Sequence, residues 1–163
     1  MRVLVVSPKA DERLRLAGAL LGRPDVEIVE ATSAVEAHQL TSERTFDVLV
    51  IDGDMRPEGG QSLLYEIRAR AEYRGEPAPP AIMLMDREQD RWISGWAGAA
   101  DVMLKPVDSF DVAERVLELM RDTGGAVPVG DEEGTAGEPL AMDEPSEFQG
   151  RSAPAAEGSP SAT

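Results

Sequence analysis

Short apolar runs recur along the first two thirds of the chain, and each ends at polar or turn-forming residues. Runs of this kind that are rich in Val, Leu and Ile are typical of strands buried on both faces of a parallel sheet. The predicted strands are residues 2–6, 26–31, 48–51, 81–85 and 101–104.

Apolar residues recur at helical spacing between the predicted strands. Ser7 is a good N-cap and Pro8 a favoured first residue, so a helix is expected from Pro8 to just before Gly22. Further helices are expected at residues 33–43, 61–73, 89–97 and from 108 or 109 onward. Strands that alternate with helices at this spacing form right-handed βαβ units. The pattern therefore predicts an α/β fold with a doubly wound parallel sheet.

The first and last predicted helices have well-defined apolar faces. The residues expected to be buried are Leu14, Ala17, Leu20 and Leu21 in the first helix and Phe110, Ala113, Leu117 and Met120 in the last. Asp11 and Glu12 lie in the first turn of the first helix, where carboxylates suit the helix dipole. We expect these two side chains to point away from the sheet edge.

Composition divides the 163 residues into two regions. Residues 123–163 are acidic and rich in Gly, Pro, Ala and Ser, with Phe148 as the one aromatic residue. Such a segment buries too little apolar surface to offset its conformational entropy, so a disordered tail is predicted there. The predicted domain is residues 1–122.

Charge and residue usage exclude several functions. A net charge of −15 predicts no binding to nucleic acid, because the protein would repel the phosphate backbone. The absence of Cys excludes thiolate metal sites, and the single His38 cannot form a histidine cluster. No apolar run is long enough to span a bilayer, and no signal peptide is recognisable, so a cytoplasmic location is expected.

An acidic loop follows the most apolar of the predicted strands. Asp52 comes directly after residues 48–51, and Asp54 is two positions further on. Open α/β sheets bind ligands at the carboxyl ends of their strands. Asp52 is therefore the first candidate for chemistry, and Asp54 is the second.

In this order and spacing the motifs resemble those of the receiver domain of bacterial response regulators. A first strand at residues 3–6 is followed by a helix, and Asp52 ends the third strand, with Met55 and Gly60 at matching distances. The segment at 97–106 (AGAADVMLKP) is similar to the family's final strand, which ends in Lys-Pro. The resemblance implies a flavodoxin-like fold with strand order 2-1-3-4-5.

The resemblance also implies roles for individual residues. Asp52 matches the phosphoacceptor, which attacks a phosphohistidine or a small phosphodonor and forms an aspartyl phosphate. Lys105 matches the lysine that pairs with a phosphoryl oxygen, and the bond to Pro106 is expected to be cis. Asp54 would offer its backbone carbonyl to Mg²⁺ beside Asp52.

Other positions depart from the family pattern. Two acids that hold Mg²⁺ at the end of the first strand are replaced by Ser7 and Pro8. The switch hydroxyl at the end of the fourth strand is replaced by Met85, and the switch aromatic by Val102. Arg56 intervenes where proline usually follows the loop methionine, and its guanidinium could instead pair with Asp52.

These departures predict a degenerate receiver, or pseudo-receiver, of the two-component and phosphorelay type. It would be a single-domain signalling protein that is not an enzyme and that acts by protein–protein contact without a Mg²⁺-dependent phospho-switch. The partner would be a histidine kinase or a downstream signalling protein, bound through the face of helix four, strand five and helix five. Trp96, at a position usually polar in the family, is a candidate interface residue, whereas Trp92 matches an apolar core position.

Two alternatives remain open. The first is a phosphorylatable receiver that uses Asp52, with a weak Mg²⁺ site at Asp52 and Asp54 that Asp86 could help to rebuild. The second starts from the sequence Asp52-Gly53-Asp54, which resembles the nucleophile motif of haloacid-dehalogenase-type phosphatases. Apart from this doubtful Mg²⁺ no cofactor is expected, because no Gly-rich phosphate loop follows the first strand.

Overall fold

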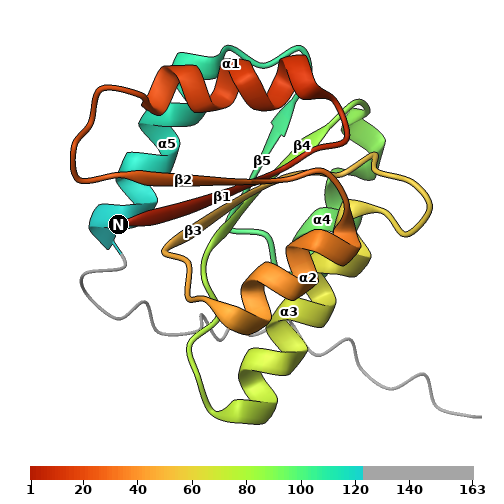
Figure 1. The fold of residues 1–163 in the computed structure, drawn as a ribbon. Helices are drawn as coiled ribbons and strands as arrows, with labels where there is room; N and C mark the ends of the chain where they lie inside the picture. The colour runs from red at the N-terminus through yellow and green to blue at the C-terminus, as the bar shows by residue number, and fades with distance from the viewer. Residues whose placement is uncertain (123–163) are drawn as a thin grey trace, which may run out of the picture. The chain divides into compact units, whose positions relative to one another are not determined.

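The computed structural model describes residues 1–122 as a parallel sheet with helices on both faces (Figure 1). The strands are β1 (Arg2–Val6), β2 (Glu27–Ala31), β3 (Val48–Asp52), β4 (Ala81–Met85) and β5 (Asp101–Leu104). The helices are α1 (Ala10–Leu20), α2 (Ala34–Glu43), α3 (Gly60–Arg74), α4 (Arg91–Trp96) and α5 (Ser109–Asp122), with one 3₁₀ turn, η1 (Glu88–Asp90). The predicted tail, residues 123–163, lies outside the described residues.

All strand pairings are parallel, and the order across the sheet is β2-β1-β3-β4-β5. The chain therefore winds outward from β1 in both directions, which confirms the predicted flavodoxin-like topology. The order reverses between β1 and β3, so the loops that follow these two strands diverge at the edge where such sheets bind ligands.

Alternate residues of the central strands pack into two separate hydrophobic layers, one on each face of the sheet. Leu4 and Leu49 pack with α2 and α3, whereas Val3 and Val48 pack with α1 and α5. Figure 1 shows the same division, with α1 and α5 on one side of the sheet and α2 and α3 on the other. Because β1, β3 and β4 are buried on both faces, they have the continuous apolar sequences from which they were predicted.

Helix α1 differs from its prediction. It begins at Ala10 rather than Pro8, and Leu14 and Leu21 are exposed. Leu16 and Leu20, four residues apart, form the buried face instead, and they fix a helical phase that turns Leu14 to solvent.

The predictions of buried aromatic residues at two other helices are also wrong. Phe110 lies in the first turn of α5 and is exposed, while the core positions of that helix begin at Val112. Trp92 is 71% exposed, because the buried position of α4 is Ser94, and residues two apart do not share a helix face.

The start of α3 lies close against the end of β3. The backbone N–H of Gly60 donates to the carbonyl of Gly53, and a Cβ atom at residue 60 would overlap the carbonyl oxygen of Asp52. Glycine at this position therefore lets the α3 backbone approach the strand that ends in Asp52.

We expect Gly60→Ala to destabilise the domain by about 1–3 kcal/mol, because the added methyl group meets backbone rather than a movable side chain. Gly18→Ala is the matched control, since Gly18 is exposed in α1 with open space around it. That substitution should stabilise by about 0.5–1 kcal/mol. Urea unfolding followed by far-UV circular dichroism measures both, and a Gly60→Ala variant as stable as the wild type would contradict the close approach.

Candidate functional site

The carboxyl ends of β1, β3, β4 and β5 bring the predicted site residues to one edge of the sheet (Figure 1). Asp52 is the last residue of β3, Met85 is the last of β4, and Ser7 and Lys105 follow β1 and β5 directly. The order of the strands thus places a residue from each of four separate segments around one point.

The ammonium group of Lys105 is the centre of this cluster. Its Nζ lies 2.5 Å from Asp52 Oδ1, 3.4 Å from Asp86 Oδ1 and 3.6 Å from Asp54 Oδ2. The Lys105 side chain is 10% exposed and that of Asp52 is 1% exposed, so solvent screens their ion pair little. The peptide bond between Lys105 and Pro106 is cis.

Backbone and hydroxyl groups hold the carboxylate of Asp52 from other sides. Its Oδ1 also accepts the backbone N–H of Asp54 at 3.0 Å, and its Oδ2 lies 3.3 Å from Ser7 Oγ. Asp54 in turn accepts the backbone N–H of Asp86 at 3.0 Å through Oδ2. The loops after β3 and β4 are therefore tied together through carboxylates near Lys105.

Glu12 also belongs to this cluster. The prediction that its side chain points away from the sheet edge is therefore wrong. Its side chain is 3% exposed, and its Oε2 accepts the Ser7 hydroxyl at 2.7 Å. The spacing of Glu12 from Leu16 and Leu20 was the available signal, because residues four apart share a helix face. The helical phase that buries these two leucines buries Glu12 with them.

Ser7 does not cap α1 as predicted. The N-cap position of α1 is Lys9, and Ser7 lies before it with 1% of its surface exposed. Its oxygen accepts the backbone N–H of Lys9 at 3.1 Å, while its single hydroxyl proton is directed to the nearer carboxylate, that of Glu12. Ser7 thus separates the two buried carboxylates, Glu12 and Asp52.

The surrounding carboxylates change the acidity of Lys105. Burial by itself lowers the pKa of Lys105, but the hydrogen bond and charge of Asp52, together with the charges of Glu12 and Asp86, outweigh it. The pKa of Lys105 therefore lies above its usual value, and the side chain remains an ammonium ion at neutral pH.

The remaining altered positions offer no polar group at the site. Met85 is buried, and its Sδ lies 3.5 Å from Gln61 Nε2 and against Gly53. Val102 is half-buried and packs against the core, and Pro8 is exposed. Arg56 forms no ion pair with Asp52 among residues 1–122, so Lys105 rather than Arg56 supplies the positive charge.

A second feature is a pair of stacked aromatic rings on the helices beside β4 and β5. Trp96 of α4 and Tyr65 of α3 stack with ring centroids 5.5 Å apart and an interplanar angle of 4°. Trp96 is nevertheless 73% exposed, so its outer surface remains available.

Comparisons with known proteins agree with this fold. No protein-family model matches the chain. An uncharacterized response regulatory protein of Mycobacterium tuberculosis is 27% identical over 126 residues, which cover 74% of this chain and 92% of the relative.

Solved structures with a similar fold include several receiver domains. That of a Clostridium thermocellum response regulator has a TM-score of 0.65 at 19% identity and covers 76% of this chain and 96% of its own. A CheY-like receiver from Methanospirillum hungatei has a TM-score of 0.65 at 22% identity, covering 76% and 95%. The receiver domain of the Francisella response regulator 1452 has a TM-score of 0.63 at 23% identity, covering 75% and 98%.

No helix within residues 1–122 is both long and apolar enough to cross a membrane. The topology, the positions of Asp52 and Lys105 and the sequence relative all lead to the same assignment. The described part of this chain has the fold of response regulator receiver domains, and its sequence is similar to that of a response regulatory protein.

Proposed function

We propose that this protein is a degenerate receiver that signals by binding a protein partner, without Mg²⁺-dependent phosphorylation of Asp52. The observation that supports this most is that Ser7 and Pro8 follow β1 in place of an acid pair, while the ammonium group of Lys105 lies against Asp52. An internal cation thereby neutralises the acceptor carboxylate in the resting protein.

The donor set does not suit a resident Mg²⁺ ion. That ion requires several oxygens in near-octahedral arrangement, and the positions after β1 offer only the hydroxyl of Ser7 and an exposed proline, Pro8. Within residues 1–122 no three Asp, Glu or His side chains are grouped so that they could hold a metal ion. Among residues 1–122, the cation that pairs with Asp52 is the ammonium group of Lys105.

Charge and access also disfavour attack by Asp52 on a phosphoryl group. An incoming phosphate ester would meet the carboxylates of Asp52, Glu12, Asp54 and Asp86, whose charges the ammonium ion of Lys105 offsets only in part. Asp52 is almost completely buried, and both of its carboxylate oxygens have close polar neighbours. Attack would require Asp52 to leave these contacts.

Phosphorylation of Asp52 would also lack the side chains that usually couple it to a conformational change at the surface. Met85 has no hydroxyl with which to bind a phosphoryl oxygen, and Val102 has no aromatic ring that could exchange between buried and exposed positions. The partner-binding face would then have one conformation rather than two.

The partner-binding face we propose is formed by α4, β5 and α5. Each contributes an exposed apolar side chain, namely Trp92 and Trp96 from α4, Leu104 from β5 and Phe110 from α5. Aromatic residues are frequent among the residues that dominate binding energy at protein interfaces. A histidine kinase or another signalling protein is the class of partner we expect.

One observation favours the alternative, a phosphorylatable receiver. Glu12 brings a buried carboxylate next to Ser7, close to where the family has its acid pair. A cation that displaced Lys105 could use Glu12 together with Asp52. The phosphatase alternative has less support, because Asp108, which would have to contribute to its site, caps α5 through a hydrogen bond to the N–H of Phe110.

Incubation with acetyl phosphate and Mg²⁺, followed by intact-mass measurement, tests the proposal. We expect the wild type to gain no phosphoryl group. The triple variant Ser7→Asp, Pro8→Asp, Glu12→Gln should gain one, because it restores the acid pair that holds Mg²⁺. The change at Glu12 is included because its buried carboxylate would otherwise face the new acid at position 7. Adding Asp52→Ala to the triple variant should abolish that gain.

Far-UV circular dichroism of each variant shows whether it folds. A phosphoryl group on the wild type that is lost in Asp52→Ala would overturn the degenerate assignment and favour the alternative. A folded triple variant without phosphorylation would show that the missing acids are not the cause.

The raised pKa of Lys105 predicts how stability depends on pH. The pair with Asp52 should contribute fully below the unfolded pKa of ~10.4 and be lost as pH rises through the higher folded value. The double variant Asp52→Asn, Lys105→Met removes both charges and is the matched reference. Its difference from wild type in unfolding free energy should stay constant from about pH 7 to about pH 10 and change above that.

The Lys105→Met single variant should have a free energy of unfolding roughly 3–5 kcal/mol lower than that of the double variant at neutral pH, because it leaves Asp52 buried without its cation. Urea unfolding at each pH measures these differences. Equal stability of the single and double variants would show that Lys105 does not compensate the buried charge.

A further inference from the structure

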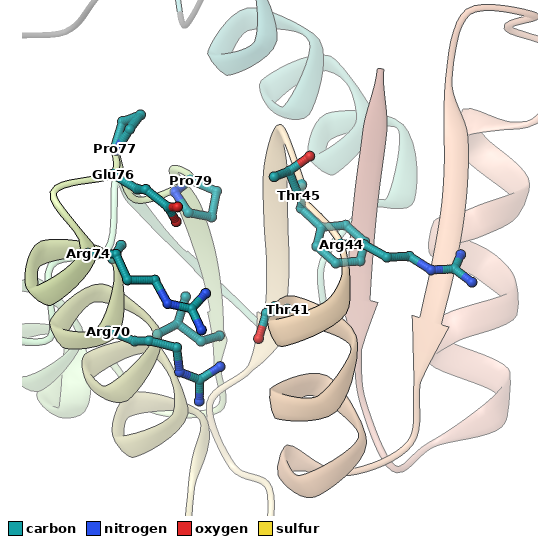
Figure 2. A pocket seen from close by; sticks show the side chains of 11 residues that line it. Thr41, Arg44, Thr45, Arg70, Arg74, Glu76, Pro77 and Pro79 are labelled. Carbon is teal, nitrogen blue, oxygen red and sulfur yellow. The ribbon is translucent and has the colours of Figure 1, made fainter.

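A cavity lies toward the amino-terminal ends of β3 and β4, away from the strand ends that carry Asp52. It is formed between α2 and α3, and the connections that line it lead into the amino-terminal ends of β3 and β4 (Figure 2). Its volume is about 90 Å³, and its walls include Thr41, Thr45, Phe46, Ile67, Arg70 and Arg74. None of these residues belongs to the Lys105 cluster.

The charged groups of this cavity are mainly cationic. Three arginines and one acid, Glu76, line it, although the protein as a whole has a net charge of −15. Figure 2 shows the guanidinium groups of Arg70 and Arg74 projecting from α3 into the space that faces Thr41 of α2. Arg44 contributes to the wall, but its guanidinium is directed away.

Arg70 is held in place by residues of α2. Its Nη1 donates to Ser42 Oγ at 2.6 Å and to the His38 carbonyl at 3.4 Å, and its Nη2 lies 2.9 Å from His38 Nδ1. The imidazole lies in turn 2.7 Å from Glu66 through Nε2. A guanidinium has five N–H donors, so Arg70 keeps donors on Nε and Nη2 for another acceptor. Its orientation is fixed before any ligand binds.

Arg74, one helical turn further along α3, complements Arg70. Among residues 1–122, no carboxylate forms an ion pair with Arg74, and Glu76 across the cavity is more than 4 Å away. Two guanidinium groups at (i, i+4) on one helix face repel each other by a few tenths of a kcal/mol unless an anion lies between them.

Size and chemistry together define the ligand. The cavity of about 90 Å³ has room for a tetrahedral oxyanion. Planar guanidinium groups match phosphate oxygens in pairs of hydrogen bonds. We propose that the cavity between α2 and α3 binds a phosphate-type oxyanion, either free or as a phosphate monoester, through Arg70 and Arg74.

Titration of the full-length protein with sodium phosphate, followed by ¹H–¹⁵N NMR including arginine Nε–H signals, tests this site. Sodium chloride keeps the ionic strength constant, because screening alone shifts signals of charged groups. We expect saturable changes at Thr41, Arg70 and Arg74. Phosphoserine in a parallel titration distinguishes the two sources, since the tighter ligand identifies the natural form.

Arg74→Gln should weaken phosphate binding by about tenfold or more, because it removes a charged, bidentate donor from an exposed position that does not support the fold. Arg74→Lys should lose part of the affinity, since it keeps the charge but not the paired donors. Arg23→Gln, at an exposed loop position, makes the same change in charge and should leave binding unaltered.

Changes that grow linearly with phosphate concentration, or that are the same in Arg74→Gln as in the wild type, would overturn the proposal. An equal loss of affinity in Arg23→Gln would do so as well, since it would assign the effect to net charge. Asp52 takes no part in any of these measurements, so their outcome is independent of the proposed function.

Discussion

The ion pair between Lys105 and Asp52 is the interaction on which the site depends. A carboxylate with 1% of its side chain exposed is tolerated only if a partner compensates the lost hydration, and the ammonium 2.5 Å away provides that compensation. The same ammonium faces Asp54 and Asp86, whose loops would otherwise bring like charges together. Lys105 thus stabilises the acidic edge of the sheet as a whole.

This arrangement depends on the positions of several elements, namely the strand ends, the start of α3 and the first turn of α1. The order β1-β3-β4-β5 brings the strand ends together, and Gly60 lets α3 approach the carbonyl of Asp52. The phase of α1 then directs Glu12 into the edge, where the hydroxyl of Ser7 lies between it and Asp52. Because Lys105 already neutralises the carboxylate of Asp52, the charge of that carboxylate is balanced without a bound metal ion. This geometry is the basis for the proposed phosphorylation-independent function.

Much of this could be predicted from the sequence because strands buried on both faces are recognisable as apolar runs. The positions of Asp52 and Lys105 follow from where those runs end. Glu12 was mispredicted because it shares the helix face of Leu16 and Leu20, which are buried. Phe110 was mispredicted because it lies in the first turn of α5, before the buried positions begin at Val112. The cavity with Arg70 and Arg74 had no signal in the sequence, because it depends on how α2 and α3 pack against each other.

In the proposed function, Lys105 takes the place of a divalent cation at Asp52. Magnesium titration of the wild type, followed through the ¹H–¹⁵N signals of Asp52, Asp54 and Lys105, tests it most directly. We expect no saturable change at these three residues up to about ten millimolar Mg²⁺, because the ion would have to displace a tethered ammonium group. Saturable binding below about one millimolar, centred on Asp52, would contradict it.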